Sequence, residues 1–283
     1  MMTVQVRFYT DPVCPWSWAA EPALRWLMWE FEGELEFVWV MGGLARSYDK
    51  ANLLDVVSVW LEDAAAGGMP SDPRIWMKNP LESTYPACRA VKAAAEQGPE
   101  AESRYLRTLR EGIMFERRKL DHPETLIDAA ERGGLERKRF EADLRSPAGD
   151  EAFEADLAEV RDPPLEARDA DAIHRSSKGW ERISFPSALF VDEDGSRHGV
   201  WGSGSVEVGR LRDAAFAAKA EQRNEGGLEP AEAIRRFGRC ATRELEVLSE
   251  KPPTELEFQL WEMAREGELK PVRALIGTLW DLA

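Results

Sequence analysis

Residues 8–27 read FYTDPVCPWSWAAEPALRWL, and this stretch decides the fold. Apolar and polar side chains alternate over residues 3–10, which predicts a half-buried β-strand. A short loop then delivers Cys14 to a helix that we expect over residues 15–31, because apolar side chains recur there at helical spacing. Residues 34–42, ELEFVWVMG, predict a second strand. The sequence therefore predicts a β-α-β unit with a cysteine at the start of its helix.

Composition and charge exclude several classes of protein. The chain has 283 residues, 43% of them hydrophobic, which is enough for one large domain or two modest ones. We see no signal peptide and no apolar run of membrane-spanning length, and therefore expect a cytoplasmic protein. A net charge of −15 argues against nucleic acid and anionic membranes as partners. The three histidines lack metal-ligand spacing, so no metal is expected.

The rest of the chain divides into three parts. Residues 47–176 have an almost wholly helical pattern, which predicts a large all-helical insertion. A β-hairpin over residues 188–201 and a helix over residues 205–223 follow. We therefore predict a first domain over residues 1–223. Three short helices and a terminal hairpin in residues 224–283 predict a small winged-helix-like module.

Cys14 is the candidate nucleophile. A helix N-terminus presents free N–H groups and the positive end of the helix dipole, so we expect the thiol pKa to fall. Ser17 stands where a C-x-x-C site has its second thiol, and it cannot form a disulfide. Its hydroxyl is expected to bond either the Cys14 thiolate or a backbone N–H group. Cys88 is the candidate resolving thiol, although a core position suits it better.

A proline before the hairpin is the second feature of the site. Pro186 lacks an N–H group and directly precedes a predicted strand, where such a residue is tolerated. A cis bond between Phe185 and Pro186 would turn backbone groups toward Cys14. We expect the substrate groove to be lined by Pro15, Trp16, Phe185 and Pro186.

DPVCPWSW at residues 11–18 resembles the opening of the DsbA-like thioredoxin-fold proteins, notably the FrnE-like branch. The helical insertion before FPS, residues 185–187, also lies where that family has one. The resemblance covers residues 3–223. It implies an α/β thioredoxin-like fold in which Cys14 attacks disulfides and Pro186 orients the substrate. Ser17 departs from the family pattern at the resolving position.

A second resemblance spans nearly the whole chain. DPVCPWSWAAEPALRWL and the end KPVRALIGTLW, at residues 11–27 and 270–280, look like the YjbH family of adaptors. That family has a DsbA-like domain and a C-terminal segment, and presents the regulator Spx to the ClpXP protease. The resemblance implies a protein partner for this chain.

Two functions therefore follow from the sequence. The first is monothiol exchange, in which Cys14 attacks a protein or small-molecule disulfide and an external thiol releases the product. It needs no cofactor, although a low-molecular-weight thiol could serve. The second is a non-catalytic adaptor that binds a protein, for example a regulator handed to a protease. The sequence leaves open whether the protein is an enzyme.

Overall fold

The computed structural model describes residues 3–176, 179–202 and 207–283. Its strands are β1 (Val4–Thr10), β2 (Leu35–Met41), β3 (Ile173–Arg175), β4 (Glu181–Ile183), β5 (Ser187–Val191), β6 (Arg197–Val200), β7 (Cys240–Ala241), β8 (Leu269–Arg273) and β9 (Thr278–Leu282). Its main helices are α1 (Pro15–Ala19), α2 (Glu21–Glu30), α3 (Leu53–Gly67), α4 (Arg74–Lys78), α5 (Tyr85–Ala95), α6 (Pro99–Arg110), α7 (Pro123–Arg132), α8 (Arg137–Arg145), α9 (Pro147–Val160), α10 (Leu165–Asp169), α11 (Val208–Ala217), α12 (Pro230–Phe237), α13 (Thr242–Ser249) and α14 (Pro253–Glu266). A 3-10 turn, η1 (Lys50–Asn52), and a π-helical turn, η2 (Glu111–Phe115), complete the set.

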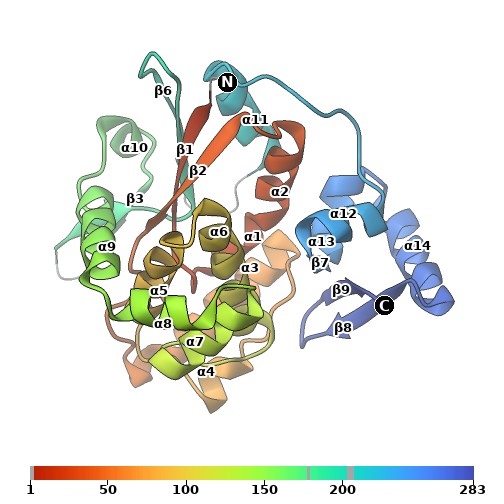
Figure 1. Ribbon diagram of the computed structural model, residues 1–283, viewed down its shortest axis with the longest axis horizontal. Helices are drawn as coiled ribbons and strands as arrows, with labels where there is room; N and C mark the ends of the chain where they lie inside the picture. The colour runs from red at the N-terminus through yellow and green to blue at the C-terminus, as the bar shows by residue number, and fades with distance from the viewer. Residues whose placement is uncertain (1–2, 177–178, 203–206) are drawn as a thin grey trace.

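A four-stranded sheet in the order β2-β1-β5-β6 carries the fold (Figure 1). β1 pairs parallel with β2 and antiparallel with β5, and β6 completes the hairpin. Val4, Val6 and Phe8 of β1 are buried, as their alternation predicts. The predicted β-α-β unit and the following hairpin are therefore confirmed.

The helix expected over residues 15–31 is broken in two. α1 ends at Ala19, and α2 begins at Glu21 with Pro22 in its first turn. A proline suits a helix start because the N–H group that it lacks would have no partner there. The break lets α1 hold Cys14 while α2 packs against α11 and α13.

The insertion over residues 47–176 contains helices α3 to α10, but the prediction that it is wholly helical is wrong at its end. Ile173–Arg175 forms strand β3, which pairs antiparallel with β4. Each of these strands has only three residues, too few for an alternating pattern to appear. Gly179, with a φ of 84°, lies between them, where a tight connection favours glycine.

The closing helix expected over residues 205–223 is shorter than predicted. Within the described chain, α11 runs from Val208 to Ala217, and residues 205 and 206 lie outside the described part. Lys219 has a φ of 66°, which ends the helix in a left-handed turn. Ala218 and Ala220 donate backbone hydrogen bonds to the last turn of the helix.

The C-terminal residues contain the three helices and the terminal hairpin predicted for a winged-helix-like module. They also contain the two-residue strand β7, which was not predicted and which pairs with β9. Figure 1 shows this module, in blue, beside α2 and away from α9 and α10. It has its own hydrophobic cluster, to which α2 contributes Trp26. Cys240 is buried in that cluster. The domain boundary at residue 224 stays a prediction.

Candidate functional site

Cys14 caps the N-terminus of α1, where the sequence places it. The preceding loop turns at Asp11, whose carbonyl oxygen accepts the Cys14 N–H group at 3.1 Å. The carbonyl of Cys14 in turn accepts from the N–H group of Trp18 at 3.1 Å. Pro15 occupies the first helical position. The loop and the first turn of α1 therefore fix the position of the thiol.

The peptide bond between Phe185 and Pro186 is cis, as predicted. The Phe185 ring, the backbone before Pro186 and Cys14 belong to one small pocket of about 210 Å³. The pocket is lined by Cys14, Pro15, Trp16, Leu44, Val59, His174, Arg182, Ser184 and Phe185. Pro186 is buried and does not line it. The sequence-predicted groove residues Pro15, Trp16 and Phe185 therefore do meet beside Cys14.

Gly42, at the end of β2, makes room for the Phe185 ring. A Cβ atom on Gly42 would lie 1.7 Å from the ring, so Gly42→Ala must displace Phe185. Overpacking of this kind is expected to lower the free energy of unfolding by about 1–3 kcal/mol. Urea denaturation measures the change. Gly209→Ala is the control, because nothing lies within 4 Å of the added methyl group, and its midpoint should equal or exceed the wild-type value. An unchanged midpoint for Gly42→Ala would contradict this packing.

The expectation that the pKa of Cys14 falls is wrong. The Cys14 side chain is only 3% exposed, and burial raises the pKa of its thiol, which the negative charge of Asp11 raises further. The Ser17 hydroxyl and N–H group and the charge of Arg182 act in the opposite direction, but burial has the larger effect. Desolvation therefore outweighs the helix N-terminus, and the neutral thiol is favoured.

Ser17 faces the thiol without an ordinary hydrogen bond. Its hydroxyl oxygen is fully buried and has no partner within hydrogen-bonding geometry in the described parts of the chain. It nevertheless lowers the pKa of Cys14 by its proximity. Neither of the two hydrogen bonds expected for this hydroxyl is formed within the described residues.

Cys88 lies in the hydrophobic core at the start of α5 and is fully buried. Its thiol donates to the Asp11 carboxylate over 3.3 Å, and burial raises its pKa well above the ordinary value. Asp11 also accepts from Thr84 and from the N–H groups of Val13 and Leu44. Cys14 belongs to a separate hydrophobic cluster. The core interpretation of Cys88 accounts for these contacts, and its role as a resolving thiol stays a prediction.

Sequence reasoning missed three polar or charged residues of the pocket, namely His174, Arg182 and Ser184. Arg182 on β4 and His174 on β3 are directly opposite each other in the antiparallel pair. The two strands bring both side chains into the lining of the Cys14 pocket. The signal that could have found them is the turn around Gly179 between two short β-prone segments.

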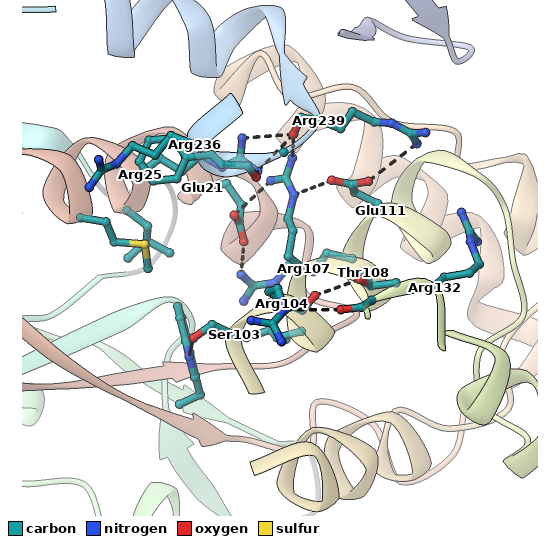
Figure 2. Close-up of a pocket in the computed structure, with 18 residues that line it drawn as sticks. Glu21, Arg25, Ser103, Arg104, Arg107, Thr108, Glu111, Arg132, Arg236 and Arg239 are labelled. Carbon is teal, nitrogen blue, oxygen red and sulfur yellow. Dashed lines mark hydrogen bonds and ion pairs between the residues drawn. The ribbon is translucent and has the colours of Figure 1, made fainter. Parts of the chain in front are cut away.

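A larger cavity, of about 430 Å³, lies between the first domain and the C-terminal module. Figure 2 shows its lining, with Glu21 and Arg25 from α2, Arg107 from α6, and Arg239 next to β7. Seven arginines line it: Arg25, Arg104, Arg107, Arg110, Arg132, Arg236 and Arg239. Each lies within 4.0 Å of a carboxylate. Because the arginines already have carboxylate partners, we interpret this cavity as part of the contact between the first domain and the C-terminal module and not as an anion-binding site.

Comparison with known families decides the identity of the fold. The family described as Thioredoxin matches residues 8–162, more than half of the chain, including Cys14 and most of the insertion. The chain belongs to the thioredoxin family. The predicted thioredoxin-like fold is therefore confirmed.

Solved structures agree with a thioredoxin fold of the DsbA type. A putative protein disulfide isomerase from Nitrosomonas europaea superposes with a TM-score of 0.62 at 17% identity, covering 76% of this chain and 97% of that one. The cytosolic disulfide reductase DsbM from Pseudomonas aeruginosa has a TM-score of 0.57 at 20% identity, with 76% and 97% coverage. At these identities the likeness concerns the fold alone.

Curated relatives extend over the C-terminal module as well. The ClpXP adapter protein SpxH of Halalkalibacterium halodurans is 26% identical over 289 residues, covering 98% of this chain and 88% of that protein. SpxH of Bacillus subtilis is 21% identical over 281 residues, with the same coverage. These relatives support the second family resemblance seen in the sequence.

In the described residues, no helix has both the length and the apolar character needed to cross a bilayer. The same parts of the chain contain no group of three or more histidine, cysteine, aspartate or glutamate side chains arranged to hold a metal ion.

Proposed function

We propose that this protein is a non-catalytic thioredoxin-fold adaptor that binds a protein partner at the Cys14 face. One observation carries the proposal: Cys14 is buried, and desolvation raises its thiol pKa. A thiol-exchange enzyme needs an accessible thiolate and a second thiol to release its product. Here Ser17 occupies the resolving position, so the pocket is better suited to binding than to exchange.

The C-terminal module supports an adaptor role because thiol exchange does not require it. Its helix α13 packs on α2, the helix that follows the Cys14 turn. Arg25 of α2 donates from Nη1 to the Cys240 sulfur at 2.8 Å and from both terminal nitrogens to the Arg239 carbonyl at 3.1 Å. These buried contacts hold the module at a fixed place beside the Cys14 domain. A bound partner would therefore be presented in a defined orientation to a third protein.

The partner that we propose is a regulator of the Spx type, and the third protein is the ClpXP protease. The relatives that match along the whole chain are named ClpXP adapter protein SpxH. This assignment places the protein in the cytoplasm, and its net charge of −15 disfavours nucleic acid as the partner.

Monothiol exchange is the second candidate function. It is favoured by one observation, the position of Cys14 in the lining of a pocket beside the cis-proline loop. In that reaction the Cys14 sulfur would form a mixed disulfide with a substrate, release the other substrate sulfur as a thiol, and be regenerated by an external thiol.

Reconstituted proteolysis tests the proposed function. Purified ClpXP and an Spx-type regulator are incubated with and without this protein, and loss of the regulator is followed over time. We expect the protein to accelerate degradation at least tenfold and Cys14→Ser to match it within twofold. No acceleration by the wild-type protein would refute the adaptor role. Acceleration that disappears in a folded Cys14→Ser variant would favour thiol exchange.

A further inference from the structure

Arg182 is a buried cation that forms no ion pair with any described residue. Arg182 is only 6% exposed. Its guanidinium carbon lies 4.2 Å from the centroid of the Phe185 ring. Nη1 donates to the carbonyl of Ile183 at 2.8 Å, whereas Nε is buried and has no acceptor in the described residues. The cavity arginines differ, because each of them has a carboxylate partner.

No carboxylate of the described residues forms an ion pair with Arg182. Burial lowers the pKa of Arg182, and the charge of Asp11 offsets this only in part. The Asp11 carboxylate accepts from four donors of other residues and forms no ion pair with Arg182 within 4.0 Å. Glu181, the preceding residue, pairs with Arg168 and Arg175 instead. Burying a guanidinium without a charged partner is costly, and an anionic group of a ligand would remove that cost.

Arg182 is placed to meet a ligand in the Cys14 pocket, and its Nε–H group is a donor without an acceptor in the described residues. It lines the Cys14 pocket together with His174, its cross-strand neighbour. Burial and the charge of Arg182 lower the pKa of His174, so its ring is neutral and can donate one further hydrogen bond. Trp16 and Val59 form apolar walls. At about 210 Å³ the pocket is smaller than a typical cofactor site and fits one side chain.

We propose that the Arg182 pocket receives the carboxylate side chain of a glutamate or aspartate on the bound protein partner. The inference rests on the proposed adaptor function and names the feature of the partner that is recognised. The guanidinium pairs with the carboxylate, His174 donates to it at the rim, and the methylene groups of the inserted side chain contact Trp16 and Val59. Arg182 is thus a specificity-determining residue of the docking site.

The resonance of the Arg182 Nε–H group tests this inference in the wild-type protein. The protein is labelled with ¹⁵N-arginine, the resonance is assigned by through-bond correlation, and the Spx-type regulator is added. We expect a saturable shift of this resonance.

In calorimetric titrations, Arg182→Met should weaken regulator binding tenfold or more. Arg175→Met, on the adjacent strand with its ion pairs at the surface, should change binding less than twofold.

The outcomes separate this inference from the function on which it rests. Regulator binding with an unshifted Arg182 resonance, or with wild-type affinity in a folded Arg182→Met variant, would overturn the inference and leave the adaptor role intact. Failure of the wild-type protein to bind the regulator would refute the proposed function and this occupant together. A shift caused by reduced glutathione but not by the regulator would assign the pocket to a small thiol and overturn the partner assignment.

Discussion

Replacing Glu244 by alanine is expected to lower the free energy of unfolding by about 3–5 kcal/mol. Glu244 lies at the start of α13 and is fully buried. Its carboxylate forms an ion pair with Arg25 at 3.0 Å. It accepts hydrogen bonds from Arg107 at 2.8 and 3.0 Å and from the N–H group of Ala241 at 2.6 Å. Without it, two buried guanidinium groups lose a shared counter-ion at the contact between the thioredoxin domain and the C-terminal module.

Urea denaturation followed by tryptophan fluorescence measures this effect. Glu246→Ala is the matched control, since Glu246 lies on the same helix and pairs with Arg243 near the surface. Such pairs contribute about 0.2–1 kcal/mol, so the control should unfold close to the wild-type midpoint. A loss of less than about 1 kcal/mol in Glu244→Ala would mean that the interface does not depend on this ion-pair network.

Asp63 is expected to make stability fall as the pH rises. Burial raises the pKa of Asp63 to about 8, whereas an unfolded aspartate titrates near about 3.9. Between these pKa values the folded chain holds a proton on Asp63 that the unfolded chain has lost. The stabilisation by protonated Asp63 is therefore fully present below about pH 4, decreases as the pH rises, and is lost once the pH passes about 8. The expected slope within this window is about −1.4 kcal/mol per pH unit.

Asp63→Asn should flatten this dependence, because the amide keeps the shape of the protonated acid and does not ionise. We compare the free energy of unfolding of the variant with that of wild type at each pH. The difference between the two should shift in favour of the variant by several kcal/mol between pH 4 and pH 8 to 9. Urea midpoints from pH 4 to 9 give the measurement. Glu62→Gln, at an exposed position on the same helix, is the control and should keep the wild-type slope. Parallel pH profiles for wild type and Asp63→Asn would contradict an ionisable buried Asp63.

Much of the fold was predictable because local patterns and tertiary structure agree. The alternation in β1, the cysteine at a helix start and the proline before β5 all lie where the sequence places them. The winged-helix-like module follows from its helix spacing and terminal hairpin. The β3-β4 pair was not predicted, because three-residue strands show no periodicity and are formed by their pairing.

The candidate site was predicted in position but not in chemistry. Proximity of Cys14, Trp16 and Phe185 follows from topology, which the sequence indicates well. The thiol pKa depends on burial, and burial depends on side chains such as Leu44 and Val59 that arrive from distant segments. The same limit applies to Arg182, whose missing counter-ion is visible only when all its neighbours are placed.

The reactivity of Cys14 tests most directly whether the pocket binds or reacts. The measurement is the pH dependence of iodoacetamide alkylation in the folded Cys88→Ala, Cys240→Ala variant, with the urea-unfolded variant as reference. Because burial raises the pKa of Cys14, we predict an apparent pKa above that of an unperturbed thiol, about 8.5, and slower alkylation than in the unfolded chain. An apparent pKa well below about 8.5, with fast alkylation at neutral pH, would contradict the adaptor account and establish Cys14 as an activated nucleophile.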